Sequence, residues 1–169
     1  MDAIEAILSR RSIRKYTKKS ISKKLIKNLL EVAMCAPSAG NQQPWHFIVI
    51  LDTQILSQIP TFHNHADMLK DAMMAILVCC DKTLETHKDM GVQDCSAATE
   101  NILIASQAMG LGAVWLGVFP RVERIKGLRN LLNIPNYVVP ISLISIGYPA
   151  EEKPIVNRYN DSRIHYNKW

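Results

Sequence analysis

The segment covering residues 94–109 constrains the fold of this chain more than any other. It is long and rich in alanine, and it contains neither glycine nor proline, a composition that favours a continuous buried helix. Gly110 follows directly, and glycine is the residue that most often ends a helix. The sequence therefore predicts a long internal helix that other elements must cover.

Short apolar runs on either side of this segment predict buried strands. They cover residues 47–51, 75–80, 113–118 and 138–146, and they are too short and too rich in Ile and Val to favour helices. The last run contains Pro140, which cannot donate a hydrogen bond to a neighbouring strand. This proline indicates either a sheet edge or a β-bulge.

Shorter helices are predicted around these strands. Residues 2–8, 53–58 and 122–132 have helical apolar spacing, and another helix is expected to begin after Ser22, a favoured N-cap residue. Helices and strands do not alternate strictly along the chain. The predicted class is therefore α+β, or a loosely wound α/β layer.

The composition suits one domain covering residues 1–169. The chain is 48% hydrophobic and 21% charged, which is ordinary for a globular protein. No apolar run approaches the ~18 residues that span a bilayer, and the N-terminus lacks the apolar region of a secretory signal. The 4 cysteines contain no C-x-x-C pair and are interpreted as reduced thiols, so we expect a cytoplasmic protein.

The net charge of +5 is concentrated near the N-terminus, where lysines and arginines occupy residues 10–27 with no acidic residue between them. Arg10, Arg11, Ser12 and Arg14 bring guanidinium groups and a hydroxyl close together, and such groups can bind a phosphate in a bidentate way. The alternative is a solvated basic turn between two helices.

Two further segments have the composition of a ligand site. Residues 37–45 read Pro-Ser-Ala-Gly-Asn-Gln-Gln-Pro-Trp, in which small residues allow a flat ligand to approach the backbone and polar side chains can bind a ring edge. Residues 110–117 read Gly-Leu-Gly-Ala-Val-Trp-Leu-Gly, and the N–H of Gly117 could face a ligand without a side chain in the way. The alternatives are a rigid turn anchored by Trp45 and a plain helix–strand connection.

Together these segments resemble the nitroreductase family. The resemblance rests on Arg-Arg-Ser-Ile-Arg at residues 10–14, on residues 36–45, on residues 109–117 and on Gly-Tyr-Pro at residues 147–149. Their order and spacing match over nearly the whole chain. The chain is similar to the short, single-domain branch of these FMN-dependent NAD(P)H oxidoreductases.

The resemblance implies an α+β sandwich with a mixed, mainly antiparallel sheet flanked by helices. Two subunits would interlock as a homodimer, with FMN at the interface and the tail, about residues 148–169, lying on the partner subunit. FMN would pass electrons from NADH or NADPH to an organic acceptor such as a nitroaromatic or a quinone, with ping-pong kinetics. No side chain is expected to act as a catalytic acid or base.

The resemblance also implies the residues that bind FMN. Arg10, Ser12 and Arg14 would hold the phosphate and ribityl chain, with Arg11 close by. A late phosphate-binding arginine would be Arg158, and Lys153 is the other candidate for that role. The flavin ring would be lined by Pro37, Ser38, Ala39 and Asn41 of the other subunit and by the backbone N–H groups of Leu116 and Gly117.

Other functions stay open at this point. Relatives with this fold dehalogenate aromatic rings or consume the flavin itself. A non-enzymatic binder of phosphate or nucleic acid would use the same basic run, but the long helix and the turn at Asn41 would then have no purpose. No metal site is expected, because His63 and His65 lack a third ligand at a useful spacing.

Overall fold

The computed structural model describes residues 1–169 and has an antiparallel sheet of 4 strands at its centre, in the order β1-β2-β4-β3. The strands are β1 (Trp45–Ile50), β2 (Met74–Asp81), β3 (Gly112–Gly117) and β4 (Val138–Gly147). A parallel bridge between Ser12 and Ala113 extends the sheet beyond β3. The sheet is thus mixed and mainly antiparallel, which confirms the predicted fold class.

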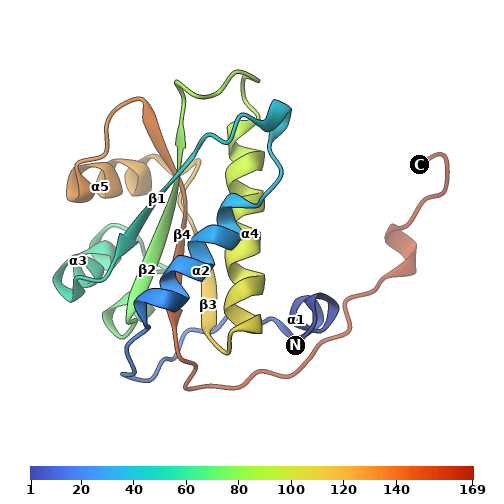
Figure 1. Cartoon of the computed structure of the whole chain (residues 1–169), viewed down its shortest axis with the longest axis horizontal. Helices are drawn as coiled ribbons and strands as arrows, with labels where there is room; N and C mark the ends of the chain where they lie inside the picture. Colours follow the sequence, from blue (N-terminus) through green and yellow to red (C-terminus); the bar gives the residue numbers. More distant parts are fainter.

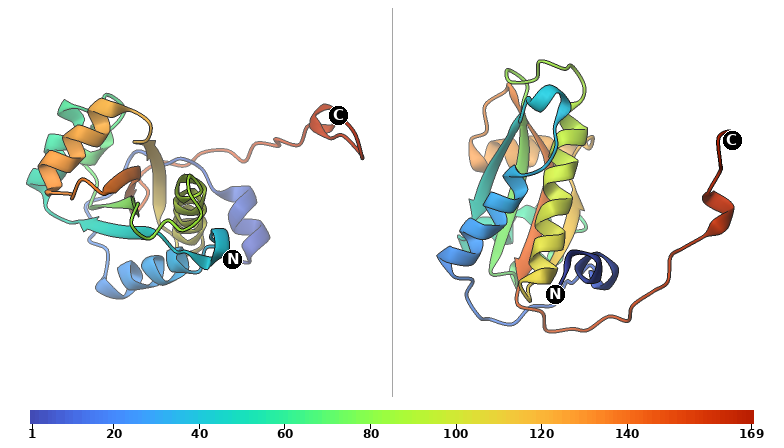
Figure 2. Two further views of the ribbon diagram at one scale, coloured as in Figure 1. Left: turned by 90° about the horizontal axis from the view of Figure 1, so that it is seen from above. Right: turned by 45° about the vertical axis from the view of Figure 1, so that its right-hand side comes forward.

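Helices cover both faces of this sheet (Figures 1 and 2). One face is covered by α2 (Lys23–Met34) and α4 (Gly91–Ala108), and the other by α3 (Thr53–Gln58) and α5 (Val122–Leu132). Helix α4 is the predicted internal helix; it begins slightly before residue 94 and ends just ahead of Gly110, whose φ is 72°. A glycine accepts this left-handed conformation without steric cost.

Strand β2 shows why the sheet is buried on both faces. All of its residues are buried, and successive side chains point to opposite faces. Leu77 packs with Leu56 and Leu128 under α3 and α5, whereas Ile76 packs with Leu29 and other residues under α2 and α4. An uninterrupted apolar run is the pattern that such a doubly covered strand requires.

Pro140 lies in β4, which is an inner strand of the sheet. Val78 pairs with Ser142 and Cys79 pairs with Pro140, so Ile141 is an extra residue opposite this step. The prediction of a bulge is therefore confirmed and that of a sheet edge is wrong. The bulge allows an inner strand to contain a residue that has no N–H to donate.

The predicted helix caps are present. Asp2 accepts a hydrogen bond from the N–H of Glu5 (2.8 Å) at the start of α1 (Ala3–Ser9), and Ser22 accepts one from Leu25 (3.3 Å) at the start of α2. Both bonds satisfy N–H groups that the first helical turn leaves free. None of the helices is both long and apolar enough to cross a lipid bilayer.

The basic segment, residues 10–22 between α1 and α2, packs against the start of β3 and the end of β4. Ile13 donates its N–H to the carbonyl of Ala113 (3.0 Å). The hydroxyl of Tyr16 donates to the carbonyl of Ile13 (2.7 Å) and also lies within hydrogen-bond distance of the carbonyl of Ser145 (3.2 Å). This close approach requires glycine at Gly147, because a Cβ there would lie 2.7 Å from a ring carbon of Tyr16.

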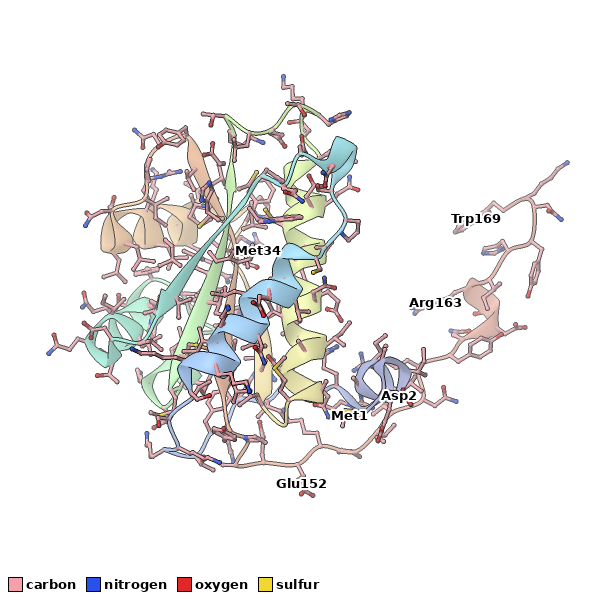
Figure 3. The ribbon with its side chains drawn as sticks, viewed as in Figure 1. Met1, Asp2, Met34, Glu152, Arg163 and Trp169 are labelled. Carbon is pink, nitrogen blue, oxygen red and sulfur yellow. The ribbon has the colours of Figure 1, made fainter.

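Residues 149–154 still contact the basic segment, and the chain then leaves the body of the molecule. It passes α1 and extends outward, and Arg163 and Trp169 lie far from the sheet (Figure 3). Its apolar side chains are exposed, as are Ile4 (66% exposed) and Leu8 (62%) of α1. The tail and α1 therefore present an apolar surface that this single chain does not cover.

We expect Gly147→Ala to destabilise the fold, because the added methyl group must displace the buried ring of Tyr16. Overpacking of this kind costs about 1–3 kcal/mol, and each kcal/mol lowers the Tm of a chain of this size by roughly 2–4 °C. Thermal unfolding followed by circular dichroism measures the change. In a Tyr16→Ala background the same substitution should cost much less, and an equal cost would contradict the assigned contact.

Candidate functional site

A cavity of about 430 Å³ opens beside the end of β3. Its volume is within the range of small-molecule sites. Arg14 from the basic segment, Leu116 and Gly117 from β3, and Arg124 from α5 all line it. The structure therefore brings together three of the residues predicted to bind a cofactor, Arg14, Leu116 and Gly117.

The end of β3 is held by donors from two other elements. The carbonyl oxygen of Gly117 accepts a hydrogen bond from Nη1 of Arg124 (2.6 Å), and Nε2 of His63 lies 3.1 Å from the same oxygen. Nothing lies within 4 Å of the position that a Cβ of Gly117 would take. A planar molecule can thus approach this part of the backbone closely.

His63 is almost completely buried at the edge of this cavity. Burial lowers the pKa of His63 below its usual range, and the nearby guanidinium of Arg124 lowers it further. The ring is therefore neutral at physiological pH. His65 lies next to it with the ring centroids 6.5 Å apart, and the pair forms no part of a metal-binding cluster.

The position of Arg14 is fixed through its backbone. Glu151, just beyond β4, accepts hydrogen bonds from the N–H groups of Arg14 (2.6 Å) and Lys15 (3.2 Å). The bond from Arg14 lowers the pKa of Glu151, with Lys153 contributing. The carboxylate is therefore charged at neutral pH and leaves the guanidinium of Arg14 free to face the cavity.

Other predicted phosphate-binding residues have partners in this chain. Arg10 lies 3.7 Å from a carboxylate oxygen of Glu100 on α4. Arg11 donates to the carbonyls of Pro154 (2.9 Å) and Leu8 (3.0 Å), and its Nη2 is buried without a partner. Arg11 thus joins the tail to α1 and keeps one unused donor.

The carbonyl of Ser12 accepts a hydrogen bond from Nζ of Lys153 (2.7 Å), so this lysine lies at the basic segment. Arg158 is exposed on the extended tail. Within one chain, the structure thus joins Lys153 but not Arg158 to the predicted phosphate-binding residues.

The turn containing Pro37, Ser38, Ala39 and Asn41 is anchored to the beginning of α4. The N–H of Ala39 and the side-chain amide of Gln42 donate to the two carboxylate oxygens of Asp94, at 3.0 and 2.6 Å. Asp94 is buried, and its partners on the turn satisfy it. The turn is therefore a rigid structure and not a mobile loop.

The turn is anchored at the first turns of α4, whereas the basic segment contacts α4 at Glu100 and the preceding Ser9 contacts it at Gln107. Asp94 binds the turn in the first turns of the helix, whereas Gln107, near the last turn, donates to the hydroxyl of Ser9 (3.2 Å). At 1.5 Å per residue these two contacts are roughly 20 Å apart. Within one chain, none of the turn residues lines the cavity beside Gly117.

Several cavity residues were not predicted from the sequence. The stretch between α3 and β2 forms the short 3₁₀ turns η2 (Ile59–Thr61) and η3 (Asp67–Lys70), which leave no periodic pattern. The only signal was the consecutive group of polar residues His63, Asn64 and His65 in this stretch. These residues line the cavity together with Met68, Trp115 and Arg124.

The donors present suit a planar molecule that carries a phosphate. Arg14 supplies a charged donor to the cavity. Arg11, whose buried Nη2 has no partner, lines a second cavity together with Lys153. The open backbone at Gly117 suits the flat part of such a molecule. Guanidinium groups are the side chains that best match a phosphate.

We expect Asp94→Ala to loosen the turn at residues 38–43. The substitution leaves the N–H of Ala39 and the amide of Gln42 without their acceptor, which costs about 1–3 kcal/mol of stability. Hydrogen–deuterium exchange should become faster at Ala39 and its neighbours.

Asp52→Ala is the matched control, since Asp52 also accepts from two N–H groups, Gln54 and Ile55, at the start of α3. It should cost about 1 kcal/mol and leave exchange at residues 38–43 unchanged. Equal exchange at Ala39 in the two variants would show that Asp94 does not hold the turn.

Comparison with known proteins gives consistent results. The nitroreductase family model matches residues 7–60 and 57–148. A protein of Methanothermobacter thermautotrophicus with the provisional name NADH dehydrogenase/NAD(P)H nitroreductase is 48% identical over 100% of this chain and 88% of its own length.

Two solved structures are also similar. One, from Parabacteroides distasonis, has the same provisional name, with a TM-score of 0.95 and 38% identity over 99% of this chain and 98% of the other. The other is an FMN-dependent nitroreductase from Clostridium difficile, with a TM-score of 0.91 and 30% identity over 98% of this chain and 99% of the other. The chain belongs to the nitroreductase family.

Proposed function

We propose that this chain is an FMN-dependent oxidoreductase that transfers electrons from NADH or NADPH to an organic acceptor such as a nitroaromatic or a quinone. The observation that carries the proposal is the cavity at which Arg14 meets the open backbone of Gly117. The similar protein from Clostridium difficile is FMN-dependent, and the relative from Methanothermobacter thermautotrophicus has a name that includes NAD(P)H.

In this proposal the cavity, the basic segment and the tail each bind a different part of FMN. Arg14, with Arg10 and Ser12 on the same segment, would hold the phosphate and ribityl chain, and Arg11 would contribute its unused Nη2. Leu116 and Gly117 would face the ring with their backbone. Arg158 would join the phosphate-binding residues from the tail.

The bound flavin would supply the capacity to accept and release electrons, which no side chain of this protein has. The protein would neutralise the phosphate with arginines and hold the ring against the fixed end of β3. Arg124 and His63 keep that end in place through the carbonyl of Gly117. One open side of the cavity would admit donor and acceptor in turn, which predicts ping-pong kinetics.

We further propose that the enzyme is a homodimer of single-domain subunits, in which Pro37, Ser38, Ala39 and Asn41 reach the flavin site of the partner. The absence of these turn residues from the cavity lining of their own chain supports a second copy. So do the exposed apolar residues of α1 and of the tail at residues 148–169.

The 4 cysteines are free thiols, as expected for the cytoplasm.

Replacing Arg14 tests the proposed cofactor site. We expect the purified protein to be yellow and to lose its flavin absorbance under NADH or NADPH. Arg14→Ala should weaken FMN binding about 10- to 100-fold, because it removes a charge-assisted hydrogen bond. Fluorescence titration of FMN measures the Kd.

Lys15→Ala is the control, since it removes the adjacent cation, which does not line the cavity. It should change the Kd by less than about threefold, as a screened surface charge does. A colourless protein that takes up no added FMN would refute the proposed function.

A subunit-mixing experiment tests the shared site. Arg14→Ala and Asn41→Ala homodimers should each bind FMN weakly. A mixed dimer places both substitutions at one site and restores the other, so about half of its sites should regain wild-type affinity. Flavin content of the isolated mixed dimer at low FMN measures this, and no recovery would place both residues at the same site of one chain.

A further inference from the structure

His63 is a buried titratable group to which the family resemblance assigned no role. It lies two residues after η2, the residue is only 1% exposed, and it lies at the edge of the cavity beside Gly117. A buried imidazole needs partners for both ring nitrogens, since an unpaired polar group in the interior is costly. Those partners determine its protonation state.

The two partners favour one form of the ring. Nε2 faces the carbonyl oxygen of Gly117 at 3.1 Å, and a carbonyl only accepts, so Nε2 carries the hydrogen. Nδ1 faces the backbone N–H of His65 at 3.4 Å, and an N–H only donates, so Nδ1 keeps its lone pair. The neutral ring satisfies both partners, whereas the protonated ring would place two N–H groups against each other.

The carbonyl of Gly117 is the point at which three elements meet. His63 reaches it from the segment between η2 and η3, and Arg124 reaches it from α5 at 2.6 Å. The next residue, Val118, donates its N–H to Ile141 on β4 at 3.3 Å. Gly117 has no side chain that could be packed, so these hydrogen bonds are what fix its peptide group.

We propose that His63 is a positioning residue, which in its neutral form holds the carbonyl of Gly117 and thereby the strand end on which the flavin ring rests. The inference rests on the proposed function for the identity of the bound ring. The contact itself is a property of this chain alone.

The charges around His63 predict how the contact responds to pH. Arg124 faces it from α5, Arg14 from the basic segment, His65 from its own segment, and Asp67 from η3, where Lys70 pairs with that carboxylate at 3.1 Å. Cations predominate, so a proton on His63 is disfavoured in the folded protein. Protonation leaves the Nε2–H donor in place, but it adds an N–H at Nδ1 that faces the N–H of His65. We expect this repulsion to shift the ring and to weaken its hold on Gly117 as pH falls through the lowered pKa of His63.

Stopped-flow bleaching of the FMN-loaded enzyme by NADPH, measured between pH 5 and 8, tests the inference. The wild-type rate should fall at the acid end. His63→Ala removes the donor and should lower the rate roughly 10- to 100-fold at neutral pH, as a displaced reacting group does.

His63→Gln supplies an amide N–H that does not titrate. It should recover most of the rate lost in His63→Ala, and its profile should be flat at the acid end. His65→Gln is the matched control: it removes the neighbouring histidine, and the acid fall should persist.

Two measurements read the contact without turnover. A ¹⁵N NMR spectrum of the histidine rings should show His63 as the neutral Nε2–H form at neutral pH and at pH values just below the usual histidine range. Hydrogen exchange at Val118 should become faster in His63→Ala and return toward the wild-type rate in His63→Gln.

An Nδ1–H form of His63, an acid fall that persists in His63→Gln, or unchanged rate and exchange in His63→Ala would each overturn the inference. A protein that binds no FMN, or is not bleached, would instead refute the proposed function. In that case the ring spectrum and the Val118 exchange still decide whether His63 holds Gly117.

Discussion

The packing of the basic segment against β3 and β4 is the interaction on which the site depends. The hydroxyl of Tyr16 donates to carbonyls at both ends of this contact, on Ile13 and on Ser145 of β4. Burial raises the pKa of Tyr16 to about 12, so the hydroxyl keeps its proton at physiological pH. Because Tyr16 and Ile13 are held inside the fold, Arg14 between them must face outward, toward the cavity at the end of β3.

The sheet supplies the rigidity that this arrangement needs. Its inner strands β2 and β4 are buried on both faces, so neither can shift without opening a core. Close packing of this kind resists displacement of even one methyl group. One wall of the cavity is the end of β3, whose backbone is held by pairing with β4.

The sequence predicted most elements because their signals are local. Helices α3 and α5 have the predicted bounds, and each strand is within about two residues of its prediction. Pro140 shows where local signals stop being sufficient. A proline fits a sheet edge or a bulge equally well, and the choice depends on which strands lie beside β4, which distant residues determine. The site shows the same limit of local sequence signals. Arg14 and Gly117 belong to sequence motifs and were named in advance, whereas Arg124 and His63 reach the cavity only through tertiary contacts.

The turn at residues 38–43 shows that the proposed dimer has a cost within each subunit. Asn41 and Gln43 have φ values of 56° and 47°, a conformation that costs a non-glycine residue on the order of 1 kcal/mol or more. Asp94 and the hydroxyl of Ser38 offset this cost through hydrogen bonds to the turn. The exposed Asn41 makes no contact with the cavity of its own chain. The turn is anchored in its own subunit through Asp94 and through the N–H of His87, which donates to Gln42. Its strained and exposed Asn41 fits the proposed contact with the flavin of a partner subunit.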